Sequence, residues 1–144
     1  MDFNQCIRFL ESEGVRCTTQ RKAILQYILK NRNHPTAMEI YKDLVNRRLS
    51  NSLANVYANL DLLEKVELIR AIRYQKVPAK YEMATEAPHC HIVCDKCGGI
   101  KDLHYLSHSE TLRKAVLNDT GFRLVDLSYE LRGICQGCHE AHTL

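Results

Sequence analysis

Four of the seven cysteines form two pairs with the same spacing, Cys94 with Cys97 and Cys135 with Cys138. Each pair can grip a metal ion through a tight turn, and two pairs supply the four thiolates of a closed, structural zinc site. The 37 residues between the pairs exceed the roughly 15–20 of a zinc ribbon, so the ion would close a whole subdomain. A thioredoxin-like redox pair explains one such motif, whereas two in a short chain favour zinc.

A second candidate metal site precedes the first cysteine pair. His89 and His91 are two residues apart, so on an extended strand their imidazoles project to the same face. A hairpin of residues 89–94 and 97–103, closed at the zinc, would bring Asp102 beside them. Glu82, a little upstream, is a further possible carboxylate. Such a mixed nitrogen and oxygen set suits Fe(II), Mn(II) or Zn(II), although a lone His-x-His is usually surface decoration.

Two other functions can be built from the same residues. A zinc metallohydrolase would use the histidines and carboxylates, but the sequence offers no general base beside an open zinc position, such as a HExxH helix. We therefore expect that the protein is not an enzyme. A zinc–thiol redox switch, in which peroxide ejects zinc from the cysteines, is the other alternative.

The charge of the chain is unevenly distributed. The net charge of the 144 residues is +3. Residues 1–80 contain 14 of the 20 Lys and Arg and 8 of the 17 acids, whereas residues 81–144 contain 6 and 9. Six of the seven His and five of the seven Cys also follow residue 80. This distribution indicates a polyanionic partner for the first half and metal for the second.

The sequence favours a cytoplasmic location. Asp2 and Asn4 occupy positions where a signal peptide has basic and then apolar residues. No apolar run approaches the roughly 18 residues that a membrane span requires. We therefore expect a soluble, cytoplasmic protein without a membrane partner, in which seven cysteines serve metal or redox chemistry better than disulfides.

The first half contains a series of helix signals, and a basic hairpin follows them. Thr18 is a good N-cap, and Thr36 forms a capping box with Glu39. Helices are expected at 2–13, 18–30, 36–45 and 52–66, and strands at 68–74 and 79–84, turning through Gln75–Pro78. This is the layout of a winged helix-turn-helix domain, with residues 52–66 as the reading helix.

The expected reading helix has an unusual outer face. Opposite its apolar stripe lie Asn55, Ala58 and Asn59, with Tyr57 on the flank. Amides and small groups suit hydrogen bonds and methyl contacts at base edges in a major groove; an ordinary solvated face is the plain alternative. Basic residues on either side would neutralise phosphates. The predicted DNA contacts are Arg16, Arg21, Ser52, Asn55, Tyr57, Asn59, Arg73 and Lys76.

The second half predicts a small α/β subdomain. Besides the metal-bearing hairpin, residues 107–118 are expected to form a helix and residues 122–132 a strand. Because about 60 residues make a thin core, zinc and pairing with a second copy would reinforce it. A homodimer would also let two reading helices contact a palindromic operator. We therefore predict an α+β protein with a DNA-binding domain, 1–84, and a dimerisation and metal-binding domain, 85–144.

Several segments, in order along nearly the whole chain, resemble the ferric uptake regulator superfamily of metal-dependent transcription regulators. They are RCTTQR at 16–21, HPTAMEIY at 34–41, SLANVYANLDLLEKVELI at 52–69, YEMATEAPHCHIVCDKCGGIKDLHY at 81–105 and GICQGC at 133–138. The resemblance implies a winged-helix domain, a hinge near residue 84 and an α/β dimerisation domain. It also implies structural zinc at the four paired cysteines.

The same resemblance implies a regulatory Fe(II) or Mn(II) site at the hinge, to which Zn(II) could also bind. Its ligands would be His34, Glu82, His89, His91 and Asp102. A ligand set drawn from both domains would make metal occupancy control their relative orientation. Bound metal would favour a closed dimer that matches two successive major grooves.

The resemblance leaves two branches of the family open. An Asp at the position of Asp102 is similar to the peroxide-stress (PerR) branch, whose members use Fe(II) to oxidise a histidine ligand, corresponding here to His34 or His89. Glu82 and its spacing to His89 are more similar to the iron-uptake branch. We favour a peroxide-sensing repressor, with an iron-responsive or other metal-responsive repressor as the alternative and the metallohydrolase as a remote one.

The chain departs from the usual family pattern at several positions. In the reading helix, Asn55 and Ala58 replace a usual Thr and a polar or basic residue, and Glu67 replaces a common Gly. Leu127 and Cys90 occupy positions that often serve a third metal site, which we therefore expect to be absent.

Overall fold

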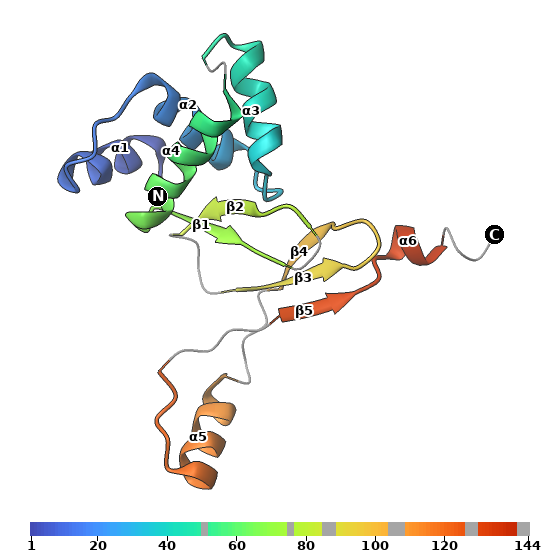
Figure 1. The fold of residues 1–144 in the computed structure, drawn as a ribbon. Coiled ribbons are helices and arrows are strands. Elements are labelled where there is room, and N and C mark those ends of the chain that lie inside the picture. Colours follow the sequence, from blue (N-terminus) through green and yellow to red (C-terminus); the bar gives the residue numbers. More distant parts are fainter. Residues whose placement is uncertain (50–51, 75–76, 85–88, 104–108, 126–129, 141–144) are drawn as a thin grey trace. The chain divides into compact units, whose positions relative to one another are not determined.

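The computed structural model describes residues 1–49, 52–74, 77–84, 89–103, 109–125 and 130–140. The chain divides into two compact units, Met1–Glu86 and Ala87–Leu144, and Figure 1 shows the elements of each. The division lies two residues beyond the boundary expected from the sequence. Among the described helices, none is both long and apolar enough to cross a membrane.

Unit 1 begins with four helices whose N-termini are capped by side chains. These are α1 (Phe3–Ser12), α2 (Thr19–Lys30), α3 (Ala37–Asn46) and α4 (Leu53–Lys65). Thr18 caps α2, and Thr36 forms the expected capping box with Glu39 on α3. Asp2 forms a second capping box, with Gln5, which we did not predict. Each box satisfies two backbone N–H groups that the helix itself leaves without partners.

The core of unit 1 lies where α2, α3 and α4 pack against one another and against a hairpin. The apolar stripe of α4 supplies Val56, Leu60 and Leu63, which are fully buried. Strands β1 (Ile69–Ile72) and β2 (Lys80–Met83) pair antiparallel, from Ile69 with Met83 to Ile72 with Lys80. The turn from α4 into β1 passes through Glu67 at φ +57°, a left-handed conformation that glycine adopts most easily. A glycine at this position would avoid that strain.

Unit 2 contains a three-stranded sheet with the order β4-β3-β5. Strand β3 (Cys90–Cys94) pairs antiparallel with β4 (Ile100–Leu103) and parallel with β5 (Glu130–Gly133). Helix α5 (Ser109–Thr120) lies between β4 and β5 in the chain, and α6 (Gln136–Glu140) follows β5. Together, the helices and small sheets of the two units make the fold α+β, as predicted.

Two elements of unit 2 differ from the sequence prediction. The helix expected at 107–118 runs from Ser109 to Thr120, and the strand expected at 122–132 is a strand only over Glu130–Gly133 within the described residues. The prediction rested on the alternation of Val125, Leu127, Tyr129 and Leu131, of which Leu127 and Tyr129 lie outside the described residues. Val125 itself is 92% exposed and is not part of a strand. Alternation alone does not make a strand, because a strand also needs a neighbour with which to pair. Leu127 lies outside the described residues, as does Lys76 in the predicted wing turn.

Candidate metal centres and nucleic-acid interface

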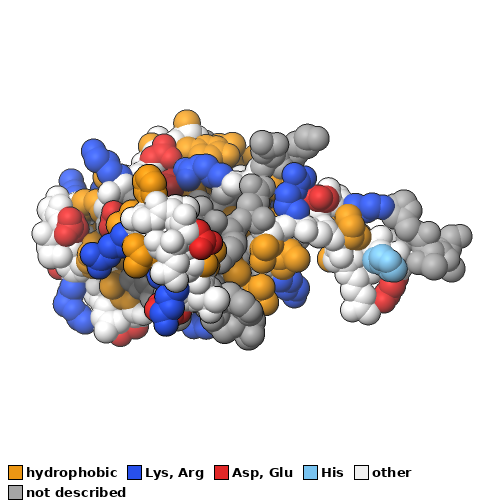
Figure 2. Space-filling view, turned by 90° about the horizontal axis from the view of Figure 1, so that it is seen from below, with side chains coloured by type: hydrophobic (Ala, Val, Ile, Leu, Met, Phe, Trp, Pro, Cys, Tyr) orange, Lys and Arg blue, Asp and Glu red, His pale blue; other side chains and the backbone are white. Residues whose placement is uncertain are grey.

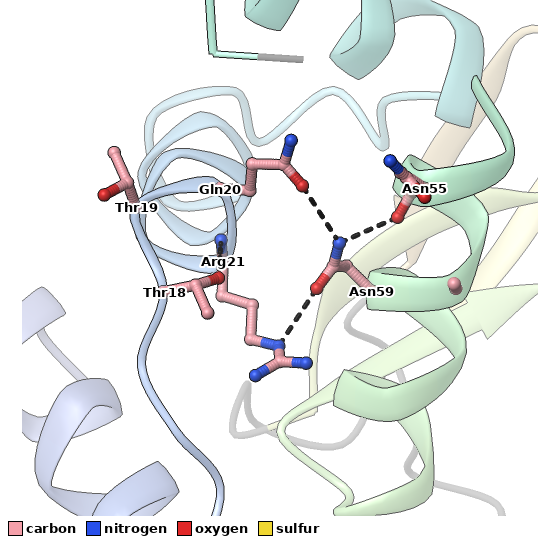
Figure 3. Close-up of a pocket in the computed structure, with 7 residues that line it drawn as sticks. Thr18, Thr19, Gln20, Arg21, Asn55 and Asn59 are labelled. Atoms are coloured by element: carbon pink, nitrogen blue, oxygen red, sulfur yellow. Dashed lines mark hydrogen bonds between the residues drawn. The ribbon is translucent and has the colours of Figure 1, made fainter. Parts of the chain in front are cut away.

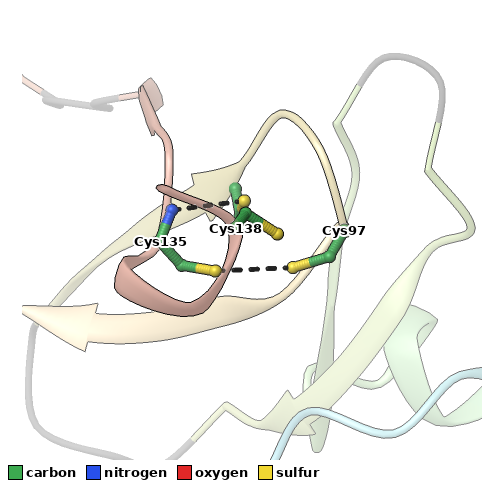
Figure 4. A group of neighbouring side chains, drawn as sticks. Cys97, Cys135 and Cys138 are labelled. Atoms are coloured by element: carbon green, nitrogen blue, oxygen red, sulfur yellow. Dashed lines mark hydrogen bonds between the residues drawn. The ribbon is translucent and has the colours of Figure 1, made fainter. Parts of the chain in front are cut away.

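The sheet of unit 2 brings the two cysteine pairs together. The parallel register places Gly133 opposite Cys94, so Cys135 follows two residues beyond the end of β3. The Cys135 N–H donates to Cys94 Sγ at 3.3 Å, and Cys97 Sγ lies 3.7 Å from Cys135 Sγ (Figure 4). The sulfurs of these three residues and of Cys138 all lie within 4.8 Å of one another. The 37-residue gap in the sequence is thus closed by strand pairing.

Local hydrogen bonds prepare this cluster for a cation. Backbone N–H groups of Cys135 and Cys97 lower the pKa of the Cys94 thiol to about 6. Hydrogen bonds with the Cys135 and Cys97 side chains raise the pKa of Cys138 to about 12, because a proton shared among crowded sulfurs is hard to remove. A divalent ion would replace those protons, since thiolates are its ligands. The four converging sulfurs therefore fit a closed, tetrahedral zinc site.

A second group of donor atoms forms across β3 and β4. The antiparallel register pairs His91 with Asp102, where the sequence predicts the carboxylate. His89 Nε2 and His91 Nε2 are 3.0 Å apart, and Asp102 Oδ1 lies 3.8 Å and 3.5 Å from them. Two imidazoles and one carboxylate facing one another are the donor types of an Fe(II), Mn(II) or Zn(II) site. By themselves these three donors would leave one position of a four-coordinate ion open, or three positions of a six-coordinate one.

Unit 1 contains a buried histidine–carboxylate pair of the same donor types. His34, between α2 and α3, and Glu82, on β2, are only 4% and 5% exposed. His34 Nε2 lies 3.3 Å from Glu82 Oε2. The pair borders a cavity of about 10 Å³, lined by Ile28, Asn31, Arg32, His34, Tyr81, Glu82 and Met83. That volume is on the order of one water molecule or small ion.

Arg70 lies next to this pair, although we did not predict it as a site residue. It lies opposite Glu82 in the β1–β2 register. Its Nη1 is 3.8 Å from Glu82 Oε1, and its Nη2 donates to the Ala84 carbonyl at 2.7 Å. The signal that could have found it is the cross-strand position opposite Glu82, once the hairpin register is assigned. For His34, the sequence without the family resemblance indicates a surface loop, whereas the structure buries it.

Some of the predicted nucleic-acid contacts of unit 1 are exposed, and others already form contacts within the protein. Asn55, Tyr57 and Arg16 are exposed. The Ser52 hydroxyl caps α4 by accepting from the Asn55 N–H at 3.4 Å. Arg73 forms a two-pronged ion pair with Glu64, at 2.7 Å for each contact, which lowers the pKa of that carboxyl. Glu64 therefore already neutralises the positive charge of Arg73, which we expected to contact a DNA phosphate.

Between the start of α2 and the outer face of α4 lies a polar cleft of about 500 Å³. Arg21 Nε donates to Asn59 Oδ1 at 2.9 Å (Figure 3). Arg21 Nη1 also donates to the Arg16 carbonyl at 2.6 Å. The structure thus brings together three predicted DNA contacts from distant parts of the sequence. The lining residues of this cleft are Thr18, Thr19, Gln20, Arg21, Asn55, Ala58 and Asn59.

The surface is not uniformly basic. Figure 2 shows one face, on which Lys and Arg side chains are interspersed with acidic and hydrophobic ones. Several large apolar side chains of unit 2 are exposed. They are Ile92, Leu103, Leu117, Phe122, Val125 and Ile134.

Comparison with known proteins relates these sites to a family. Residues 12–132 match the Ferric uptake regulator family. The peroxide operon regulator of Bacillus subtilis is 34% identical over 137 residues, which cover 95% of this chain and 93% of that protein. The description of this relative as a regulator agrees with the expectation that the chain is not an enzyme.

Solved structures give the same result for the fold. The ferric uptake regulator of Francisella tularensis with iron matches with a TM-score of 0.79 and 26% identity, over 88% of this chain and 96% of that one. PerR of Streptococcus pyogenes, a structure described as the basis for peroxide sensing and gene regulation, matches with a TM-score of 0.53 and 28% identity. This match covers 94% of this chain and 92% of that one.

Proposed function

Because this chain belongs to the ferric uptake regulator family, we propose that it is a metal-dependent, DNA-binding transcriptional repressor that senses peroxide. Unit 1 would hold the operator, and unit 2 would hold zinc and a second copy of the chain. The observation that carries the proposal is the presence in each unit of an incomplete set of metal donors. These are the buried His34–Glu82 pair in unit 1 and the set of His89, His91 and Asp102 in unit 2.

The two incomplete donor sets would complete one coordination sphere if a single ion took ligands from both. Two donors in unit 1 and three in unit 2 would together give five ligands, which leaves one position open on a six-coordinate Fe(II) or Mn(II) ion. An ion shared by the units would couple its occupancy to their relative orientation. A bound ion shifts a conformational equilibrium only if its affinity differs between the two conformations. Coordinating side chains from both units would give the ion that difference, because their distance depends on how the units are oriented.

Peroxide sensing would follow from oxidation of one of these ligands. When bound, Fe(II) would activate the peroxide by electron transfer. In the net reaction, one peroxide oxygen would enter a C–H bond of the ring of His34 or His89 and the other would leave as water, so the ring would supply the two electrons that reduce the peroxide. A modified imidazole holds a metal less well, so the two donor sets would separate and operator affinity would fall. Asp102 and the similarity to the Bacillus subtilis peroxide operon regulator support this branch.

An iron-responsive repressor is the second candidate. Glu82 and its spacing to His89 are more similar to the iron-uptake branch of the family. Similarity to the iron-containing regulator of Francisella tularensis also favours it. In this case metal binding would be reversible, and no ligand would be consumed.

The cysteine cluster would hold zinc for structure rather than for sensing. Four thiolates leave no open position, and the ion would tie α6 and the β3–β4 turn to the sheet. The exposed apolar side chains of unit 2 would be covered in a homodimer. Two copies would place two α4 helices on a palindromic operator, and we expect the protein to act in the cytoplasm, where the chromosome lies.

One experiment separates the candidates. The protein is loaded with Fe(II) or with Mn(II) and treated with peroxide, and DNA binding and peptide masses are then measured. A gain of one oxygen at His34 or His89, with iron only, and a parallel loss of DNA binding support the peroxide sensor. Reversible metal dependence without added oxygen supports the iron sensor. Loss of zinc before loss of DNA binding would contradict both and favour the zinc–thiol switch.

A further inference from the structure

Two asparagines lie one turn apart on the outer face of α4, and their amides have different surroundings. Asn59 is half-buried: its Oδ1 accepts from Arg21 Nε at 2.9 Å, and its Nδ2 donates to the Asn55 carbonyl at 2.7 Å. The same Nδ2 lies 3.5 Å from Gln20 Oε1. The hydrogen-bonding capacity of the Asn59 amide is therefore used within the protein, and it joins α4 to α2 (Figure 3).

Asn55 presents its amide outward instead. The residue is exposed in the first turn of α4, and its carboxamide forms no hydrogen bond with another described residue. Only its backbone is engaged, through the Ser52 cap and the Asn59 side chain. The Asn55 side chain borders the 500 Å³ cleft without contributing to the contacts that hold the cleft together.

The chemistry of this face distinguishes between bases. An asparagine amide matches adenine, which offers one acceptor and one donor in the major groove, whereas guanine offers two acceptors and is read by Arg or Lys. Helix α4 carries no Lys or Arg from Leu53 to Glu64. Arg21, the cation that lines the same cleft, has two of its nitrogens engaged with Asn59 and Arg16. Exposed Ala58, three residues after Asn55, offers a methyl group suited to a thymine methyl.

We propose that Asn55 determines the base specificity of the DNA contact by forming paired hydrogen bonds with an adenine edge in the major groove. Ala58 contacts a neighbouring thymine methyl, and Asn59 is a positioning residue that holds α4 and Arg21 together. This inference rests on the proposed DNA-binding function and adds to it the identity of the base that is read and of the residue that reads it.

The test uses full-length, Mn(II)-loaded protein and a pool of random DNA duplexes, with bound sequences read after selection. The wild type should select adenine at one position of each half-site. Asn55→Ala should reduce that preference by about 5-fold to 100-fold, the range of a paired base contact, and leave the other positions unchanged. Asn55→Arg should move the preference at that position towards guanine.

Asn59→Ala is the matched control, because it removes the same amide one turn away. It should weaken binding to all sequences similarly and leave the base preferences as in the wild type, with folding checked by circular dichroism. The proposal is overturned if Asn55→Ala retains the wild-type preferences, or if Asn59→Ala changes the preference at the same position. Failure of the wild-type protein to enrich any duplex would instead overturn the DNA-binding function, and this inference with it.

Discussion

The two units are stabilised in different ways. Unit 1 has a continuous core of sixteen buried residues contributed by its helices and hairpin. In unit 2, Val93 and Cys94 are the buried apolar residues among those the structure describes. A unit of this size with so little core needs another source of stability, such as a metal ion or a partner chain. Unit 1 therefore has enough buried core to fold by burial, whereas we expect unit 2 to depend on a bound ion or a partner chain for its stability.

Removal of zinc should therefore have the largest effect and should act on one unit. Structural zinc contributes about 10–16 kcal/mol to folding in small zinc domains. Chelation, or Cys97→Ser, should unfold unit 2 and leave the helices of unit 1 protected, as hydrogen exchange measured by mass spectrometry would show. Cys90→Ser, a half-buried cysteine of the same unit outside the cluster, should change little. Simultaneous loss of protection in both units would show that they are not independent.

Truncation of a core side chain should give the next largest effect, and we expect this effect in unit 1. Leu60 is fully buried in unit 1, so Leu60→Ala should lower the free energy of unfolding of that unit by about 2–5 kcal/mol. Phe122→Ala, in unit 2, should leave the stability of unit 1 unchanged and weaken the dimer. Urea denaturation and sedimentation measure the two effects. A Leu60→Ala protein as stable as the wild type would contradict the described core.

A smaller effect is expected at the carboxylate of unit 1. Arg70 lies 3.8 Å from Glu82 Oε1, so its positive charge competes with a divalent ion for that oxygen. Because Arg70 is about half exposed, solvent screens the ion pair, which contributes about 0–1 kcal/mol. Arg70→Gln should therefore tighten Mn(II) binding by up to about fivefold in calorimetry. Arg8→Gln, at an exposed position of α1, is the control, and weaker binding by Arg70→Gln would show that Arg70 instead orients Glu82.

A similarly small effect is expected at the turn after α4. Glu67 has φ +57°, a conformation that costs a residue with a Cβ atom about 1 kcal/mol relative to glycine. Glu67→Gly should therefore raise the melting temperature of unit 1 slightly. Glu67→Ala removes the same charge and keeps the Cβ atom, so it should give no such gain. Equal effects of the two variants would assign the change to charge rather than to backbone strain.

Sequence reasoning was most successful where structure is local. Capping motifs located α2 and α3, and the hairpin closed at Cys94 and Cys97 gave the His91–Asp102 pairing. It was less successful where contacts between residues far apart in the sequence determine the structure. The burial of His34 depends on β2, and the difference between Asn55 and Asn59 depends on side chains of α2 that lie 38 and 39 residues from Asn59. Within the described residues, the strand expected at 122–132 is found only from Glu130 onward, because alternation does not tell whether a neighbouring strand is present.

The proposed function requires one regulatory ion with ligands from both units, and the Mn(II) affinity of a His34 variant measures whether unit 1 contributes to that site. His34→Asn removes the imidazole and keeps a residue that tolerates the φ of +53° at this position. This change in unit 1 should weaken Mn(II) binding by about tenfold or more, to a degree comparable with His91→Ala in unit 2. An unchanged Mn(II) affinity in His34→Asn, beside a large loss in His91→Ala, would show that the ion belongs to unit 2 alone.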